Sequence, residues 1–199
     1  MRIRYWKQCY VRREYEELLH NNVMKLGTKY VFICTDNKKE GTSMNIRRAE
    51  NKDMNGINKL LHQVLMVHHN GRPDIFKPNA KKYTDAELMD ILADDSKPVF
   101  VATDEQEEVL GYAFCVFQQH LNNNILTDIK TLYIDDLCVD EEKRGMHIGT
   151  ALYEYVLDFA KASGCYNVTL NVWSCNESAM KFYEKCGLVP QKVGMEKVL

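Results

Sequence analysis

The sequence lacks the features that would place the protein in a membrane, outside the cell or on nucleic acid. It has no apolar run close to the roughly 20 residues that cross a bilayer, and its first residues are too polar for a secretory signal. The net charge is only −2, and no basic block stands out. We therefore expect a cytoplasmic protein without a membrane or nucleic-acid partner.

The spacing of the cysteines argues against two further kinds of site. The seven cysteines are scattered without a C-x-x-C pair, so neither a zinc site nor a disulfide framework is indicated. We expect no bound metal and interpret the cysteines as reduced packing residues. Cys138 is a candidate nucleophile because it lies close to the proposed site, but no sequence feature supplies a base for it. Packing is the preferred interpretation.

The chain divides into an N-terminal extension and one domain. With 45% hydrophobic and 27% charged residues it can form a single buried core. Residues 1–43 contain a helix-like stretch, the strand-like run TKYVFIC and a polar tract that predicts a linker. A second start codon at Met44 would leave these residues peripheral to the fold. We expect 1–43 to be an extension of unknown role and 44–199 to be the domain.

Hydrophobic periodicity from Met44 onward predicts strands early and a strand–helix alternation late. Such a pattern is typical of a mixed α/β sheet flanked by helices. Thr84 and Glu87 form a capping-box pattern before the second helix. The expected strands are 45–49, 97–103, 109–119, 129–139, 166–173 and 188–199, and the expected helices are 53–67, 85–93, 148–162 and 178–186.

The segment IDDLCVDEEKRGMHIG indicates a site for phosphate groups. A strand runs into a charged turn and then directly into an amphipathic helix that begins near Ile148. Free N–H groups at a helix start, aided by the helix dipole, attract phosphate oxygens, and Arg144 can add a charge-assisted contact. The same pattern also occurs as plain architecture, so on physical grounds alone both interpretations stand.

This loop resembles the cofactor motif of the GNAT superfamily of N-acetyltransferases, which reads Arg or Gln, two variable residues, Gly, one variable residue, then Gly or Ala. Arg144, Ile148 and Gly149 fit, whereas His147 stands at the first glycine. His tolerates unusual backbone angles comparatively well, so the loop need not be broken. The resemblance implies a mostly antiparallel sheet splayed at an acetyl-CoA site formed by Leu137, Cys138, Val139, Arg144, Gly145, Met146, His147, Ile148, Gly149 and Thr150.

The segment NESAMKFYEKCGLVP resembles a second motif of the same superfamily. Asn176 stands at the start of its helix, and the resemblance implies a cofactor contact; as a plain N-cap it would satisfy the helix end. The matching Tyr in the family lies beside the cofactor sulfur. Tyr183 is therefore expected to protonate the departing thiolate, although it could also be a core aromatic.

A tandem pair of carboxylates, Asp135 and Asp136, interrupts an otherwise apolar strand. Side chains alternate along a strand, so the two point to opposite faces unless a bulge intervenes, and at most one should serve the cleft. Asp135 would share its face with Tyr133, Leu137 and Val139. We expect Asp135, through a water, to act as the base for an incoming ammonium, with Asp136 second. Satisfied buried carboxylates or a capping acid are the alternative.

The stretch HHNGRPDIFKP resembles a connection seen in a subset of the superfamily where the acceptor binds. The resemblance implies that His69, Arg72, Asp74 and Phe76 shape the acceptor pocket, although the proline could simply set a turn and Phe76 could be core. Taken together, the similarity covers about residues 44–199.

The resemblance implies an acetyl-CoA-dependent N-acetyltransferase in which a primary amine attacks the thioester directly. Because the two carboxylates favour a cation, we expect a small amine or polyamine-like acceptor, while a peptide N-terminus or a lysine stays open. Two other classes also remain: a CoA-binding regulatory module without activity, and an interaction protein that uses residues 1–43. A homodimer is compatible with the sequence.

Overall fold

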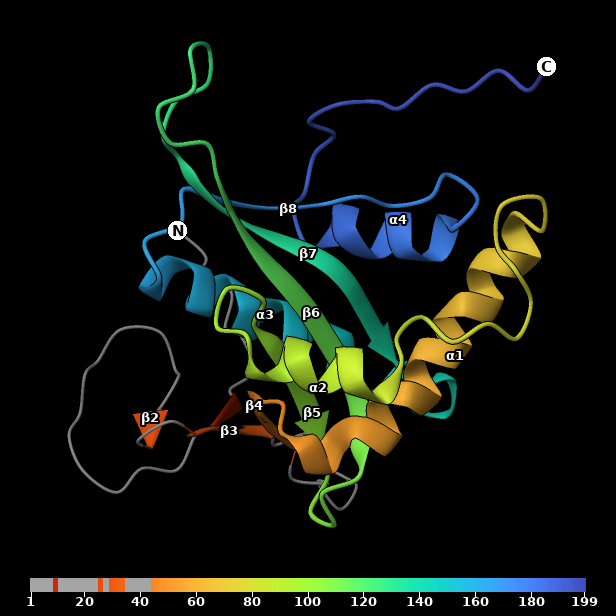
Figure 1. Cartoon of the computed structure of the whole chain (residues 1–199). Coiled ribbons are helices and arrows are strands. Elements are labelled where there is room, and N and C mark those ends of the chain that lie inside the picture. The colour runs from red at the N-terminus through yellow and green to blue at the C-terminus, as the bar shows by residue number, and fades with distance from the viewer. Residues whose placement is uncertain (1–8, 11–24, 27–28, 35–43) are drawn as a thin grey trace, which may run out of the picture.

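The computed structural model describes residues 9–10, 25–26, 29–34 and 44–199, and Figure 1 shows their arrangement. The strand expected at TKYVFIC is observed as β3 (Lys29–Cys34). The helix-like stretch and the linker expected in the first 43 residues lie outside the described residues.

The centre of the fold is a mixed, mostly antiparallel sheet, which confirms the predicted fold class. Strand order is β1-β3-β4-β5-β6-β7-β8, and β2 pairs with β3. Neighbouring strands are antiparallel except β7 and β8, which are parallel. The further strands are β1 (Cys9–Tyr10), β2 (Lys25–Leu26), β4 (Met44–Arg48), β5 (Val99–Thr103), β6 (Val109–Gln119), β7 (Lys130–Val139) and β8 (Asn167–Leu170).

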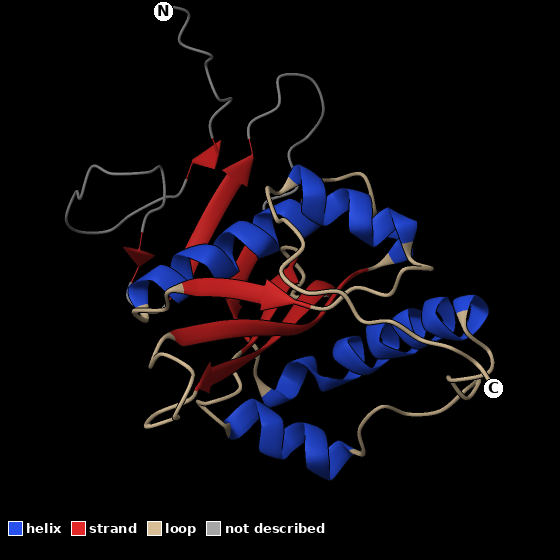
Figure 2. Cartoon of the chain, turned by 90° about the horizontal axis from the view of Figure 1, so that it is seen from above, coloured by secondary structure: helices blue, strands red, loops and turns tan. Residues whose placement is uncertain are grey.

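Helices cover both faces of the sheet (Figure 2). One face carries α1 and α2, and the other carries α3 and α4. Their bounds are α1 (Met54–Gly71), α2 (Asp85–Ala93), α3 (Ile148–Ala162) and α4 (Glu177–Lys185), with short 3₁₀ turns η1 (Asn51–Asp53) and η2 (Glu141–Lys143). No helix in the described part of the chain is long and apolar enough to cross a membrane.

Alternation along β5 places buried side chains on both sides of the sheet. In β5, Val99 and Val101 pack with α1 and α2, whereas Phe100 and Ala102 pack with α3. All four are at most 2% exposed. Because full burial of a large apolar side chain contributes about 1.5–3 kcal/mol, these two layers hold the central strands rigidly.

The start of α2 is fixed as the sequence predicts. The backbone N–H of Glu87 donates to Thr84 Oγ1 at 3.2 Å, and the backbone N–H of Thr84 donates to Glu87 Oε2 at 2.7 Å. This capping box satisfies two N–H groups that a helix end would otherwise leave unpaired. The connection between α1 and α2 therefore ends at a defined residue.

The strand expected at 188–199 is wrong, because this described segment contains no strand. Pro190 lacks the N–H that a ladder needs, and Gly194 weakens any strand that contains it. Val193 and Met195 are 76% and 91% exposed, so the apolar side chains that alternate along this segment do not pack against the core. The end of the chain extends away from the sheet (Figure 1).

Candidate active site

A β-bulge divides β7 at the tandem carboxylates. Phe114 of β6 pairs with Asp136, but the next residue, Cys115, pairs with Ile134, so Asp135 is the extra residue. The bulge shifts the alternation: Ile134 and Leu137, three residues apart, both pack toward α3. The expectation that Asp135 shares a face with Leu137 and Val139 is therefore wrong, because it assumed a regular strand.

The open edge of β7 begins at this bulge. The parallel pairing with β8 ends where Ile134 meets Leu170, while β7 continues to Val139. Beyond Ile134, no strand among the described residues pairs with β7 on its β8 side. On this side of β7, the backbone groups of Leu137, Cys138 and Val139 therefore have no partner strand among the described residues.

The loop that leaves β7 is tied to α1. The buried carboxylate of Asp140 accepts from Lys59 Nζ at 2.7 Å and from Gln63 Nε2 at 3.3 Å. Gln63 Oε1 in turn accepts from the backbone N–H of Glu141 at 3.2 Å. Burial alone would raise the pKa of Asp140, but these donors outweigh it and lower the pKa. The carboxylate thus stays ionised and holds the loop in place.

The turn before α3 uses left-handed backbone conformations at two residues. Gly145 has φ +83° and His147 has φ 60°, ψ 12°. His147 thus adopts a conformation that usually requires glycine, which explains how it can replace the glycine of the family motif. Its side chain, like those of Arg144 and Met146, is exposed at the helix start.

The start of α3 meets both β7 and α4. A methyl group on Gly149 would lie 3.5 Å from Val139 Cγ2 and 3.6 Å from the ring of Phe182. Buried Ile148 anchors the first turn, and half-buried Thr150 completes it. The anion-attracting helix start, the open edge of β7 and the helix of Tyr183 therefore converge at one place.

Tyr183 lies half-buried on α4, beside Phe182. Burial, and secondarily the negative charge of Asp136, raise the pKa of its phenol well above the ordinary value. The hydroxyl is therefore protonated throughout the physiological range. Asn176 caps α4, because its Oδ1 accepts from the backbone N–H of Ala179 at 3.2 Å.

Both carboxylates of the bulge contact one ammonium group. Lys82 Nζ donates to Asp135 Oδ2 and to Asp136 Oδ2, each at 3.1 Å. The buried Tyr112 hydroxyl also donates to Asp136 Oδ2, at 3.2 Å. The side chain of Asp136 is 9% exposed and that of Asp135 37%. The expectation that at most one of the pair serves the cleft assumed a regular strand, and the bulge removes that restriction.

Cys138 packs as a small core residue. Its Sγ lies 3.7 Å from the carbonyl oxygen of Leu60, within the core on the α1 side of the sheet. Burial, helped by the nearby Asp136, raises the pKa of the thiol to about 12. Because the thiolate is the reactive form, this thiol is a poor nucleophile at neutral pH.

The loop after α1 reaches the connection between β8 and α4. His69 Nδ1 donates to the carbonyl oxygen of Phe76 at 2.7 Å, and the Phe76 ring contacts the Trp173 ring edge-on, with centroids 5.2 Å apart. A carbonyl oxygen only accepts, so Nδ1 carries the hydrogen. His69 and Phe76 thus shape the loop from within.

Arg72 and Asp74 form an ion pair at the start of this loop. The Arg72 guanidinium donates to Asp74 Oδ2 at 2.8 Å and to Glu196 Oε2, from the C-terminal segment, at 2.8 Å. Arg72 is thus saturated by two carboxylates. The sequence did not indicate Glu196 as a partner of Arg72, and the role of Arg72, Asp74 and Phe76 at the acceptor stays a prediction.

Lys82, Tyr112 and His68 are the residues of this region that sequence reasoning missed. Lys82 is one of several lysines in a polar connection, and Tyr112 sits inside an apolar strand, so neither carries a motif. The His68 ring lies tilted against the Phe76 ring, with centroids 5.0 Å apart. Burial lowers its pKa despite the opposing charge of Asp136, so its imidazole is neutral at pH 7.

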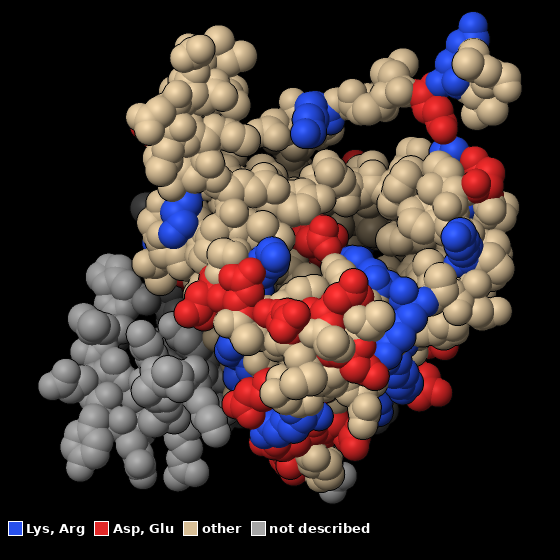
Figure 3. Space-filling view, in the orientation of Figure 1, with Lys and Arg blue, Asp and Glu red and all other residues tan. Residues whose placement is uncertain are grey.

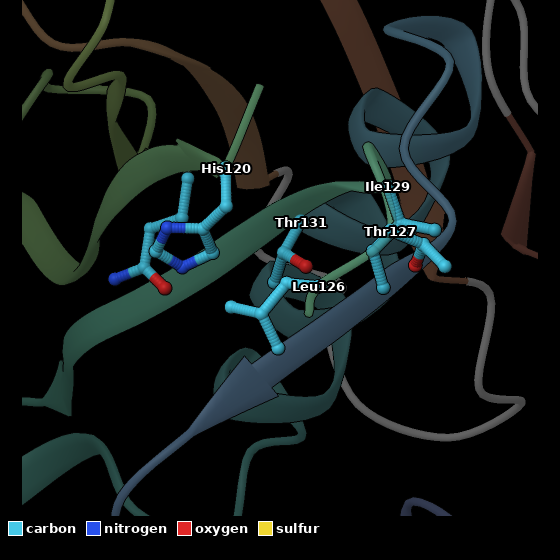
Figure 4. Close-up of a pocket in the computed structure, with 6 residues that line it drawn as sticks. His120, Leu126, Thr127, Ile129 and Thr131 are labelled. Atoms are coloured by element: carbon cyan, nitrogen blue, oxygen red, sulfur yellow. The ribbon is translucent and has the colours of Figure 1, made fainter. Parts of the chain in front are cut away.

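A cavity of about 120 Å³ lies elsewhere, at the far end of the β6–β7 hairpin (Figure 4). No expected catalytic, cofactor-binding or acceptor-binding residue lines it. Its lining consists of Gln118, His120, Leu126, Thr127, Ile129 and Thr131.

The fold is that of an acetyltransferase of the kind the sequence resembles. A family model described as the Acetyltransferase (GNAT) family matches residues 66–188. The chain belongs to this family.

A solved structure shares the fold of this chain. The crystal structure of a mutant of the BH1408 protein from Bacillus halodurans is 32% identical, covers 77% of this chain and 98% of its own, and superposes with a TM-score of 0.75.

Two curated relatives match over shorter segments. A glucosamine 6-phosphate N-acetyltransferase from Arabidopsis thaliana is 37% identical over 68 residues, 34% of this chain and 44% of the relative. N-alpha-acetyltransferase 30 from Schizosaccharomyces pombe is 32% identical over 93 residues, 47% of this chain and 58% of the relative. The chain thus spans less than two thirds of either relative.

Proposed function

We propose that the protein transfers the acetyl group of acetyl-CoA to a small primary amine by direct attack. The observation that carries the proposal is the convergence of the open edge of β7, the start of α3 and Tyr183 of α4. The proposal also follows from membership of an acetyltransferase family.

The residues at the convergence fit acetyl-CoA. The N–H groups of the first turn of α3 and the exposed Arg144 suit its phosphates, and Val139 of β7 and Phe182 of α4 lie close to that turn at Gly149. The open backbone of Leu137–Val139 would hold the pantetheine arm and polarise the thioester carbonyl. When bound, acetyl-CoA supplies an activated acetyl group with a thiolate leaving group.

The carboxylates of the bulge would bind the acceptor ammonium and receive its proton. Asp136 is fixed by Tyr112, whereas Asp135 is more exposed and can reach solvent. A proton passed through water to Asp135 or Asp136 leaves the free amine beside the thioester. Attack then forms the amide without a covalent enzyme intermediate.

Tyr183 would protonate the departing thiolate. Its raised pKa makes it a weaker acid than an ordinary phenol but keeps the proton in place until the thiolate develops. The hydroxyl can also stabilise the negative charge on sulfur through a hydrogen bond.

The acceptor is proposed to be a small amine, with amino sugars and polyamines as the first compounds to test. The Arabidopsis relative acts on glucosamine 6-phosphate, and the fission-yeast relative is named as an N-alpha-acetyltransferase. A peptide with a free N-terminus therefore belongs in the same panel.

The test combines binding with turnover. Calorimetry with acetyl-CoA should give saturable heat, and release of free thiol should depend on an amine drawn from glucosamine, glucosamine 6-phosphate, spermidine, ethanolamine, O-phosphoethanolamine, butylamine, γ-aminobutyrate and a short peptide. Arg144→Ala should weaken acetyl-CoA binding, and exposed Lys161→Ala, remote on α3, is the control. Saturable binding without transfer to any amine would identify a CoA-binding module instead, and absence of binding would refute the proposal.

A further inference from the structure

Lys82 fills the place where the proposed mechanism requires the acceptor ammonium. Its Nζ bridges Asp135 and Asp136, and it lies 5.4 Å from the centroid of the Tyr83 ring. Burial alone would lower the pKa of Lys82, but Asp136 and Asp135 outweigh it and raise the pKa far above the ordinary value. The group is therefore a permanent cation at the acceptor site.

We propose that Lys82 determines acceptor specificity: the acceptor is a primary amine that also carries an acidic group, which pairs with Lys82 once the acceptor ammonium has taken over the two carboxylates. This inference rests on the proposed function and names the class of acceptor.

The first step of the argument is charge balance. Asp135 and Asp136 together carry two negative charges, and Lys82 supplies one positive charge, so the site has room for one further ammonium. A polyamine would bring additional positive charge into a site that already holds Lys82. One acceptor ammonium offsets the remaining negative charge, so the site favours an acceptor with a single ammonium.

The second step is the cost of an unpaired ammonium. The side chain of Lys82 is 34% exposed, and its charge is now satisfied by the two carboxylates. When an acceptor ammonium claims those carboxylates, Lys82 needs another anion, because a partly buried charge without a partner is destabilising. A phosphate or carboxylate on the acceptor meets that need.

The third step is that the backbone of Lys82 is held close to a fixed helix start. Lys82 lies two residues before Thr84, which caps α2, so its backbone cannot move far without breaking the cap. The displaced ammonium therefore stays next to the acceptor.

Neighbouring cations are already engaged in other ion pairs. Lys81 donates to Asp85 at 2.6 Å, and Arg72 is saturated by Asp74 and Glu196. Figure 3 shows acidic and basic side chains gathered next to each other over α1 and α2, consistent with local pairing. Lys82 differs because its partners are the carboxylates assigned to the acceptor.

The test uses matched pairs of amines with and without an acid group: ethanolamine with O-phosphoethanolamine, butylamine with γ-aminobutyrate, and glucosamine with its 6-phosphate. The wild-type kcat/KM should favour an acidic member by about tenfold or more, which corresponds to about 1.4 kcal/mol. The phosphate and carboxylate pairs distinguish which acid group is recognised.

Lys82→Met should abolish this preference, chiefly by raising KM for the acidic member, while Lys82→Arg should retain most of it. Lys81→Met is the matched control and should behave as wild type. If Lys82→Met does not fold, the wild type alone decides, because a preference that depends on an ion pair must shrink between about 0.05 M and about 0.5 M salt.

The outcomes separate this inference from the proposed function. Transfer to the plain amines at the same or a higher rate than to their acidic partners overturns the inference and leaves the acetyltransferase proposal standing. A preference that survives in Lys82→Met, or that salt leaves unchanged, overturns it too. Absence of transfer to every amine overturns the acetyltransferase proposal itself.

Discussion

The two halves of β7 have different surroundings although they belong to one strand. Thr131–Ile134 pair with β6 on one side and with β8 on the other, so their backbone groups are used within the sheet. Asp136–Val139 pair with β6 alone, and Val139 lies next to the start of α3. The bulge at Asp135 is the boundary between the halves.

This difference separates structural residues from residues available for chemistry. Leu132 and Ile134 of the paired half are at most 2% exposed, whereas Asp135 of the open half is exposed and Leu137 is only half-buried. Substitutions in the paired half should therefore act on stability, and substitutions around the open half should act on binding and turnover.

The largest expected effect is on the open side, at Tyr183. Tyr183→Phe removes the proposed acid and should lower kcat by about 100-fold to 10,000-fold, because general acid catalysis contributes that much. The dissociation constant for acetyl-CoA, measured by calorimetry, should stay the same. Tyr166→Phe is the control, because Tyr166 is 76% exposed beside the paired half. An unchanged kcat in Tyr183→Phe would remove the role assigned to it.

On the paired side, Leu132→Ala should lower the free energy of unfolding by about 2–5 kcal/mol through the cavity it leaves. Leu132 is fully buried, whereas Leu137 of the open half is not, so Leu137→Ala should cost clearly less. Urea unfolding measures both variants. Equal losses would mean that the open half is packed as tightly as the paired half.

The boundary itself can be examined at the two carboxylates. Asp136→Asn should reduce kcat/KM for the amine on the order of tenfold more than Asp135→Asn, because Asp136 is the less exposed and is also bonded to Tyr112. Hydrogen bonds to charged groups contribute about 1.5–3 kcal/mol, which covers this difference. The opposite ranking would make Asp135 the main proton acceptor.

The smallest effects should come from the turn before α3. His147→Gly relieves a left-handed non-glycine residue and should raise the free energy of unfolding by about 1 kcal/mol. Gly145→Ala should lower it by a similar amount, because an added methyl group meets nothing within 4 Å and backbone strain alone remains. Thermal unfolding compares them, and a shift of the same sign in both variants would contradict the assignment of strain.

Acetyl-CoA titration of His147→Gly separates two further effects: tighter binding means that the imidazole crowds the phosphates, and weaker binding means that it contacts them.

The sequence predicted the elements that periodicity and capping specify. The capping box at Thr84 and Glu87 and the helix from Ile148 to Ala162 are observed as expected, because both depend on local patterns. The bulge at Asp135 was not predictable, since it contains neither glycine nor proline and arises from pairing with β6. Lys82 was missed for the same reason: its partners are more than 50 residues away. The strand expected at the C-terminal end failed because alternation alone cannot supply a neighbouring strand.

The hydrogen bonds between Asp140 and α1 have a consequence for the spacing of two loops, the one that leads to α3 and the one that follows α1. Lys59 and Gln63 of α1 hold the loop that leads to α3, and His69, near the end of α1, bonds to the loop that is proposed to contact the acceptor. From Lys59 to His69 the helix rises about 15 Å, at about 1.5 Å per residue. Helix α1 therefore sets the distance between the loop that leads to α3 and the loop proposed to contact the acceptor, and a one-residue deletion between Lys59 and His69 would change the position of one loop relative to the other.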